Sequence, residues 1–412
     1  MRIAFIVNGF PVISETFILD QITWLIAHEC EVDIYTQRLW LQAASHPEVM
    51  ALGLMDRAFA LSPPPAPNES ARIRRAVRDV ARAFTRSPAV VLRALNPAWF
   101  GSDVLSFKPF YRALPFLAQR PYDVVHCHFG PNGILGVELR DLGALQAPIV
   151  TQFHGYDASS YVRERGEDVY RTLFAKGDQF LCVSERIQAR LVEMGCDERK
   201  TRVHHTGVKV GQIPFISRVL NAGEAPRLLS VCRLVEKKGV EFGLRAVARL
   251  IKDHPNIEYT IIGEGPERAA LTKLCHELGL DGHVKLLGAQ TRDVVAAAMA
   301  KAHIFLAPSV RAKNGDEEGI PVVLMEALAA GLPAVSTLHA GIPELIAHGV
   351  SGMLAPERDA EAFADHISFL LSHPDERSAM AVAGRRTVER DYDVDQLNVQ
   401  LLMRYREISG KI

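Results

Sequence analysis

Short β-type runs alternate with helix-length amphipathic stretches along nearly the whole chain. The first unit is RIAFIV (2–7), followed by SETFILDQITWLIAHE (14–29) and EVDIYT (31–36). Because each strand is followed by a stretch long enough to cross back over a sheet, this alternation predicts parallel sheets covered by helices on both faces. Further strands are expected at 123–128, 148–153, 179–183, 227–231, 258–262, 284–287, 303–307 and 333–336.

The predicted strands fall into two groups, separated by a stretch without periodicity in which Gly, Pro and Asn accumulate. At 412 residues, the chain also exceeds the ~100–200 residues of an ordinary domain. We expect a first domain over 1–207, a linker over 208–226, a second domain over 227–390, and a helix over 391–412 that packs back on the first domain. The predicted fold class is α/β, with two Rossmann-like, doubly wound parallel-sheet domains facing across a cleft. Such sheets bind ligands at the carboxyl ends of their strands, so the site is expected in that cleft.

Charge and hydropathy exclude several classes of protein. The formal net charge of -1 gives no overall electrostatic reason to bind nucleic acid, and no nucleic-acid partner is expected. No stretch approaches the ~18–20 consecutive apolar residues that span a bilayer. The apolar run at the N-terminus is broken by Asn8, Gly9 and Pro11, so it predicts a strand and not a signal peptide. We expect a cytoplasmic protein, and peripheral contact with the inner face of a membrane stays open.

One basic segment interrupts the alternating pattern. Residues 71–95 (ARIRRAVRDVARAFTRSPAVVLRAL) hold seven arginines against one acidic residue, with apolar residues at near-helical spacing. Two interpretations are open. The segment is a solvated helical insertion in the first domain, or it is a basic amphipathic surface that meets anionic lipid or a pyrophosphate-linked acceptor.

The segment 307–346 combines an anion site with two carboxylates. An irregular polar loop follows a predicted strand and leads to a helix that is expected to begin near Pro321. The backbone N–H groups of Gly319 and of residues 320–323 would then face the loop and could bind phosphate oxygens. Glu318 precedes this helix and Glu326 lies inside it. Because carboxylates accept hydrogen bonds from vicinal hydroxyls, the corner is suited to a phosphorylated, hydroxyl-rich ligand.

Two glutamates separated by seven residues, in the setting EGIPVVLMEALAAGLPAVST followed by GIPELI, resemble the signature of the retaining glycosyltransferases of family 4, which have the GT-B fold. The resemblance implies that Glu318 contacts hydroxyls of the donor sugar and that Glu326 holds the ribose of the nucleotide. The runs GFPVISETFILDQI, STLHAGIPEL and DEEGIPVVLMEA resemble a narrower bacterial group that assembles colanic acid and similar exopolysaccharides. Donor contacts are thereby implied for Glu318, Gly319, Ile320, Pro321, Val322 and Glu326.

A second corner, LLSVCRLVEKKGVEFGLRAVARL (228–250), places cations at the carboxyl end of a predicted strand. Arg233 and Lys238 are expected there as two fixed cations that neutralise a diphosphate and stabilise the charge growing on it as the sugar leaves. The family's Arg in this turn and its Lys before Gly239 are both present, whereas Lys237 is interpreted as facing solvent. The resemblance implies no cofactor and no metal site, with a UDP- or GDP-sugar as the co-substrate.

Three further residues are assigned to the donor. Gly9 is expected directly after the first strand, where a glycine lets the backbone approach phosphate. By the resemblance, His154, which follows the strand 148–153, lies beside the donor sugar. Gly263, which closes the strand 258–262, is expected near the nucleotide base. No complete dinucleotide-binding glycine fingerprint follows that strand or the first strand of the chain. His126 and His128 alternate on one strand, and we interpret them as packing or cleft-lining residues because no further metal ligands can be nominated.

The resemblance implies transfer of a sugar, with retention of anomeric configuration, to a growing bacterial exopolysaccharide or cell-surface glycan whose acceptor could be polyprenyl-pyrophosphate-linked. Neither carboxylate is expected to act as a nucleophile. The diphosphate is expected to leave on the face that the acceptor attacks, and its oxygen to help deprotonate the acceptor hydroxyl. Catalytic roles are assigned to Glu318, His154, Arg233 and Lys238. Two alternatives remain open: a nucleotide-sugar 2-epimerase-like enzyme on the same scaffold, and a non-catalytic nucleotide-sugar-binding protein.

Overall fold

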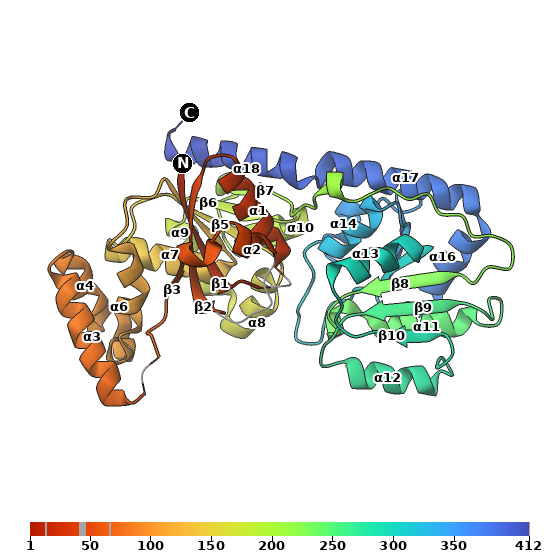
Figure 1. Cartoon of the computed structure of the whole chain (residues 1–412), viewed down its shortest axis with the longest axis horizontal. Coiled ribbons are helices and arrows are strands. Elements are labelled where there is room, and N and C mark those ends of the chain that lie inside the picture. Colours follow the sequence, from red (N-terminus) through yellow and green to blue (C-terminus); the bar gives the residue numbers. More distant parts are fainter. Residues whose placement is uncertain (13–14, 41–46, 66, 412) are drawn as a thin grey trace.

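A seven-stranded parallel sheet forms the centre of the first of two α/β lobes (Figure 1). The computed structural model describes residues 1–12, 15–40, 47–65 and 67–411. The strand order is β3-β2-β1-β4-β5-β6-β7, which reverses between β1 and β4 as in a doubly wound sheet. Its strands are β1 (Arg2–Phe10), β2 (Glu31–Leu39), β3 (Ala58–Ala60), β4 (Val124–His128), β5 (Ile149–Phe153), β6 (Gln179–Cys182) and β7 (Thr201–Val203).

The central strand β1 is apolar on both faces because helices cover the sheet on both sides. Residues 3–7 are fully buried, and their side chains enter two different cores in alternation. One core contains α1 (Thr16–Ala27), α2 (Pro47–Ala51) and α18 (Val394–Ser409). The other contains α7 (Gly130–Leu142), α9 (Arg171–Lys176) and α10 (Glu185–Glu193), with the short helix α8 (Ser160–Arg165) beside it.

The second lobe repeats this architecture with a six-stranded parallel sheet, ordered β10-β9-β8-β11-β12-β13. Its strands are β8 (Arg227–Val231), β9 (Glu258–Ile262), β10 (Val284–Leu286), β11 (Ile304–Ala307), β12 (Ala334–Thr337) and β13 (Met353–Ala355). Its helices are α11 (Val240–Leu250), α12 (Arg268–Glu277), α13 (Arg292–Lys301), α14 (Val322–Ala329), α15 (Ile342–Leu345), α16 (Ala360–Ser372) and α17 (Pro374–Asp391). The predicted fold class, two doubly wound parallel-sheet domains, is confirmed.

Between β3 and β4 the chain leaves the first sheet and forms a helical insertion, which projects from the outer side of the first lobe (Figure 1). It consists of α3 (Glu69–Phe84), α4 (Pro88–Ala94), α5 (Pro97–Phe100) and α6 (Lys108–Ala113). The arginine-rich segment therefore forms two helices, because Pro88 begins the second one. Ala76 and Ala83 face inward, whereas Ile73, Val77 and Phe84 are 45%, 59% and 44% exposed.

The chain crosses between the lobes twice, at neighbouring positions. Val208 N–H donates to Tyr392 O over 2.9 Å, and Val394 N–H donates to Val208 O over 3.0 Å. The residues after Val208 do not form a free tether, because the Arg218 side chain donates to carbonyls of α13 and of the residue that follows it. Helices α17 and α18 flank the second crossing and run along one side of both lobes (Figure 1).

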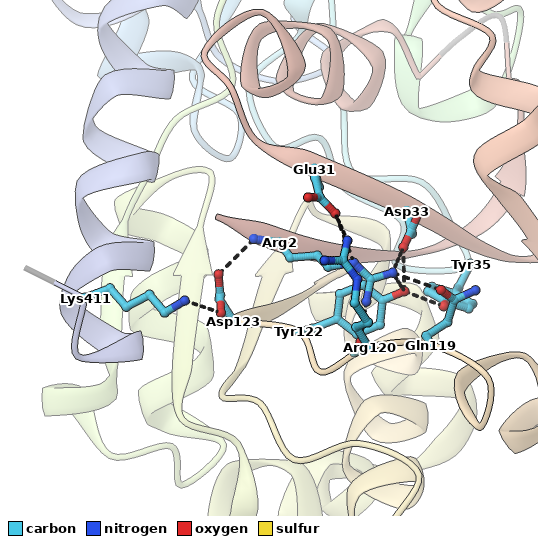
Figure 2. Close-up of polar contacts among 9 residues, drawn as sticks. All are labelled: Arg2, Glu31, Asp33, Tyr35, Gln119, Arg120, Tyr122, Asp123 and Lys411. Carbon is cyan, nitrogen blue, oxygen red and sulfur yellow. Dashed lines mark hydrogen bonds and ion pairs between the residues drawn. The ribbon is translucent and has the colours of Figure 1, made fainter.

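The last helix, α18, is held to the first lobe by buried side chains within the helix and by an ion pair just after it. Leu401 and Tyr405 are fully buried in the core that also holds α1. Beyond the helix, Lys411 Nζ donates to Asp123 Oδ1 over 2.7 Å, and Asp123 Oδ2 accepts from Arg2 N–H over 2.8 Å (Figure 2). Arg2 also pairs with Asp33 over 2.6 Å. This network lies at the amino ends of β1 and β2, so the carboxyl edge of the sheet is left to the loops.

Several boundaries differ from the predictions. β1 continues through Phe10, so Gly9 lies inside the strand, paired with Arg38, instead of following it. Of the predicted helix 14–29, Ser14 lies outside the described residues, and α1 begins at Thr16. The edge strands β3, β7 and β13 have three residues each, too few to show a periodic pattern. None of the described helices is both long enough and apolar enough to cross a membrane.

Candidate active site

Loops from both lobes touch where the carboxyl ends of the two sheets face each other. Gly155 follows β5, and Gly319 lies between β11 and α14. A Cβ atom on Gly155 would lie 3.0 Å from Gly319 N, and one on Gly319 would lie 2.6 Å from His154 O. Gly155 also has a φ of 132°, which other residues rarely adopt. The two lobes are therefore in backbone contact at this point, and the predicted site residues surround it.

Glu318 forms a buried ion pair with the lysines of the second corner. Lys238 Nζ lies 2.8 Å from Glu318 Oε1, and Lys237 Nζ lies 4.0 Å from the same oxygen. Burial alone would raise the pKa of Glu318, but Lys238 and Lys237 outweigh it and hold this pKa at about 2. The sequence interpretation of Lys237 as solvent-facing is wrong. Its side chain is 9% exposed and also pairs with Asp316 over 3.1 Å, because the turn Glu236–Lys238 directs it under the loop before Glu318.

A histidine and a glutamate that the sequence analysis did not select position Glu318. Glu318 N–H donates to His339 Nε2 over 3.2 Å, and His339 Nδ1 hydrogen-bonds to Glu357 Oε1 over 2.6 Å. Glu357 in turn accepts from Arg311 N–H over 2.8 Å. Since His339 accepts at Nε2, its proton lies on Nδ1 toward Glu357. This series of hydrogen bonds fixes the backbone of Glu318 without using its carboxylate.

The start of α14 presents backbone donors beside this ion pair. Among the hydrogen bonds of the described residues, none uses the N–H of Gly319, Ile320, Val322 or Val323. The helix begins at Val322, one residue later than predicted, because Pro321 has an extended ψ of 119° and takes the capping position. Unpaired N–H groups and the positive end of a helix dipole together suit an anion.

Glu326 lies in the second turn of α14 and faces the first lobe. Burial raises the pKa of its carboxyl, Arg292 opposes this shift, and Asp20 of α1 adds to it. Its carboxylate forms no hydrogen bond or ion pair with any residue that the structure describes. Glu326 is thus a second carboxylate at the same corner, available to hydroxyl groups.

Arg233 and Glu15 face each other from the two lobes. Of the two cations predicted to bind the diphosphate, Lys238 is held by Glu318, whereas Arg233 is exposed and pairs with no described residue. Burial raises the pKa of Glu15 to about 7, and the charge of Arg233 counteracts this rise. Glu15 Oε2 is buried without a hydrogen-bond partner in the described structure. The sequence analysis missed Glu15; its position shortly after β1 was the available signal.

His154 lies at the contact between the lobes as a neutral imidazole. Its Nε2 is 3.0 Å from His128 Nδ1, and the ring of Phe17 packs against it at 4.7 Å. Burial lowers the pKa of His154 to about 3. The loop is held by Asp157, whose Oδ1 accepts from the N–H groups of His154 and Gly155 over 2.9 and 3.0 Å. A neutral, positioned imidazole can hydrogen-bond a sugar hydroxyl without adding charge.

His154 is one of four neighbouring histidines, which we call the histidine column: His126, His128, His154 and His204. The rings of His126 and His128 stack at 4.4 Å, and His126 Nδ1 hydrogen-bonds to the Tyr405 hydroxyl. Burial lowers the pKa values of His126 and His128 well below normal and that of His204 to about 3. Within the described ranges, no group of three or more His, Cys, Asp or Glu side chains is arranged to hold a metal ion.

The two predicted glycines lie on opposite sides of the site. A Cβ atom on Gly9 would lie 3.1 Å from Trp40 Nε1. Gly263 has a φ of 144°, and a Cβ there would collide with Cys232 O. Gly263 therefore packs against the loop that carries Arg233, and it shapes that loop from behind.

A cavity of about 300 Å³ opens beside Glu318, between α8, α10 and the loop before Glu318. Arg163, Arg186 and Arg311 line it, and Arg163 Nη1 reaches across to Lys313 O over 3.0 Å. The lining also contains four glutamates, Glu167, Glu193, Glu317 and Glu318, and two of them pair with its arginines, Glu167 with Arg190 and Glu317 with Arg311, so this side of the contact carries mixed charge from both lobes.

Both halves of the chain match described sequence families. Glycosyltransferase Family 4 matches residues 14–212, and Glycosyl transferases group 1 matches residues 212–387. The chain is also 36% identical over 408 residues to WcaL of Escherichia coli (strain K12), whose name assigns it provisionally to colanic acid biosynthesis as a glycosyltransferase; the match covers 97% of this chain and 98% of the relative. The chain is a family 4 glycosyltransferase.

Further similarities agree with this family. The glycosyltransferase is 34% identical over 397 residues to the amylovoran biosynthesis glycosyltransferase AmsK of Erwinia amylovora, covering 95% of this chain and 96% of the relative. Its structure resembles sucrose-phosphate synthase of Thermosynechococcus elongatus, with a TM-score of 0.75, 19% identity and full coverage of both chains. It also resembles HepE of Anabaena in complex with UDP, with a TM-score of 0.71, 16% identity and coverage of 99% and 100%. These likenesses confirm the GT-B fold.

Proposed function

We propose that this glycosyltransferase moves a sugar from a nucleotide diphosphate sugar to a growing bacterial exopolysaccharide, with retention of anomeric configuration. The relatives that match nearly its whole length carry names from colanic acid and amylovoran biosynthesis, which supports the exopolysaccharide assignment. HepE, a neighbour in fold, has been solved with UDP and with UDP-glucose, which supports a nucleotide-sugar donor.

One observation carries the proposal: the Glu318–Lys238 ion pair lies beside the unpaired N–H groups at the start of α14. A diphosphate at these N–H groups would compete with Glu318 for Lys238, and Arg233 is available for a second phosphate contact. Glu318 would then be released toward hydroxyls of the donor sugar. Preorganised cations and N–H groups stabilise the charge that develops on the diphosphate as the glycosidic bond breaks.

The proton of the acceptor hydroxyl needs a recipient on the face from which the diphosphate leaves. We assign this role to an oxygen of the departing diphosphate. Glu318, which two lysines hold ionised, positions the sugar, and the neutral His154 side chain donates or accepts a hydrogen bond with a hydroxyl of the same sugar. The acceptor oxygen forms the new glycosidic bond on the same face of the sugar from which the diphosphate departs, so the anomeric configuration is retained.

Isosteric variants of the two glutamates test this division of roles. Glu318→Gln should keep affinity for the free nucleoside diphosphate and lose turnover. Glu326→Gln should lower both nucleotide affinity and turnover, because the free nucleotide contains the ribose that Glu326 holds but not the sugar that Glu318 contacts. Calorimetry with UDP and GDP and a turnover assay would measure this, with Glu317→Gln as the matched control for nucleotide affinity. Equal loss of nucleotide affinity in the two variants, or normal turnover by Glu318→Gln, would contradict the assignment.

Product analysis separates the proposal from its alternatives. An epimerase-like enzyme would convert the nucleotide sugar without an acceptor, and a non-catalytic binding protein would leave it intact. Thermal-shift screening of UDP-, GDP- and ADP-sugars would identify the donor base. A partial relative, 32% identical over 180 residues, is named a GDP-mannose-dependent mannosyltransferase of Mycobacterium tuberculosis, so both UDP and GDP belong in the screen.

We also propose that the helical insertion contacts an anionic membrane. Its exposed apolar side chains on α3 lie beside the arginines of the same helix. Each basic residue near an anionic surface contributes about 1 kcal/mol, so replacing Arg74, Arg75, Arg78 and Arg82 by Gln should abolish binding to vesicles that contain phosphatidylglycerol. Donor binding should be retained. Absence of salt-sensitive vesicle binding by the unmodified protein would contradict membrane contact.

A further inference from the structure

The motif GIPELI, which follows β12, carries a carboxylate that reaches from the second lobe to the first. Its residues form the short helix α15, in which Ile342 and Leu345 are buried in a core of the second lobe. Glu344 lies between them, and its Oε2 accepts from Glu185 N–H over 2.9 Å and its Oε1 from Arg186 N–H over 3.2 Å. Both N–H groups belong to the first turn of α10, so this carboxylate caps a helix of the opposite lobe.

Helix α10 has a local cap as well, so it does not depend on Glu344 to begin. Ser184 occupies its N-terminal capping position, and Ser184 Oγ accepts from Ile187 N–H over 3.2 Å. The bonds to Glu344 are additional, and they come from a position 158 and 159 residues further along the chain. Because hydrogen bonds to an ionised carboxylate are stronger than those between neutral groups, their contribution is to the docking of the lobes.

The segment that carries Glu344 also holds the loop of Glu318. His339 Nε2 accepts from Glu318 N–H over 3.2 Å, and Gly341 N–H donates to Gly319 O over 3.2 Å. Residues 339–344, which we call the coupling segment, therefore contact the Glu318 loop at one end and the start of α10 at the other.

Close packing between the lobes surrounds the coupling segment. A Cβ atom on Gly341 would lie 2.9 Å from Ser184 Cβ, and one on Gly319 would lie 2.8 Å from Val183 Cγ2. Val183 and Ser184 connect β6 to α10 in the first lobe. Helix α10 also lines the cavity beside Glu318. A displacement of α10 from the second lobe would therefore remove contacts from the Glu318 loop and widen this cavity.

We propose that Glu344 is a positioning residue, which keeps the two lobes together around the reacting sugar by capping α10. The inference rests on the proposed function, in which Glu318 of the second lobe and His154 of the first contact the same sugar. Without the carboxylate, the lobes separate in a larger fraction of the molecules, and the Glu318 loop moves away from His154. Glu344 contacts no reacting atom and acts through the geometry of the loop.

Small-angle X-ray scattering of the protein without nucleotide tests this closure directly. Glu344→Ala removes both hydrogen bonds and should increase the radius of gyration. Glu344→Gln keeps one acceptor oxygen and should have a smaller effect. Glu185→Gln is the matched control, because it removes a negative charge at the same end of α10 with an exposed side chain that forms no described hydrogen bond to the second lobe. It should scatter like the unmodified protein.

Kinetics and calorimetry separate positioning from loss of folding. Turnover should fall at least ~10-fold in Glu344→Ala and less in Glu344→Gln, because the two lobes must hold one sugar together. Affinity for UDP or GDP should stay within about twofold, since the diphosphate contacts proposed above belong to the second lobe alone. A variant that was only unstable would lose nucleotide affinity and turnover together.

The inference is overturned if Glu344→Ala scatters like the unmodified protein, if it turns over at the rate of Glu185→Gln, or if its nucleotide affinity falls as much as its turnover. Absence of turnover by the unmodified protein would refute the proposed transfer instead. The scattering comparison, which needs no donor, would then still decide whether Glu344 holds the lobes together.

Discussion

Three fully enclosed members of the histidine column should make the folded protein sensitive to mild acid. His126, His128 and His204 are fully enclosed, and burial lowers their pKa values, that of His204 to about 3. Because an unfolded histidine titrates near pH ~6.5, each of these groups takes up a proton on unfolding below that pH. Their contribution to stability is therefore present above pH ~6.5 and is lost progressively as the pH falls toward the folded pKa.

The size of this effect follows from the unfolded pKa alone, provided that the folded pKa lies well below the assay range. Each buried imidazole then lowers the free energy of unfolding by about 1.4 kcal/mol between about pH 7.5 and pH 5.5. Three of them lower it by about 4 kcal/mol. Glu15 has the opposite effect. Because its pKa in the folded state is about 7, the folded state takes up a proton at a higher pH than the unfolded state does, which raises the free energy of unfolding by up to about 2 kcal/mol over the same pH range.

Urea unfolding at several pH values, followed by far-ultraviolet circular dichroism, would measure the loss, to which these four groups together contribute about 2 kcal/mol. Removing the opposing group in Glu15→Gln should make the decline with acid steeper, and His204→Asn should make it shallower. A free energy of unfolding that stays level or rises between these pH values would refute the reasoning. So would a Glu15→Gln variant with an unchanged pH dependence.

Three further predictions concern single contacts. Gly155→Ala should slow turnover at least ~10-fold with little change in nucleotide affinity, because the added Cβ meets Gly319 N at the contact between the lobes; steady-state kinetics and calorimetry would show this. Lys238→Met should raise the pKa of the buried partner carboxylate from about 2, so the acidic limb of the pH–rate profile should move to higher pH; an unmoved limb would contradict the pairing. Asp123→Asn should cost no more than about 1 kcal/mol of unfolding free energy and should speed hydrogen exchange at the end of α18, because the ion pair with Lys411 is partly exposed.

Much of the fold is visible in the sequence because burial leaves a local periodic record. The strands β8 and β9 have the predicted bounds, since both are apolar runs between polar turns. The carboxylates Glu318 and Glu326 are visible because their spacing and the following helix are local features. The edge strands β3, β7 and β13 and the burial of Lys237 were not predicted, although the equally short edge strand β10 was. Three residues carry little periodic pattern, and the turn Glu236–Lys238 directs both of its lysines toward Glu318, which no local pattern indicates.

Local sequence patterns are enough to predict the two doubly wound sheets, the bounds of β8 and β9 and the corner that holds Glu318, because hydrophobic period and turn residues act over a few positions. Which other residues share that corner depends on how the chain folds in three dimensions. Arg233 faces Glu15 across the lobes, and His339 holds the backbone of Glu318. The contact of Arg233 with Glu15 depends on how two separately folded sheets dock, and that of His339 with Glu318 on how neighbouring loops of one sheet pack, and no local pattern in a chain encodes either arrangement.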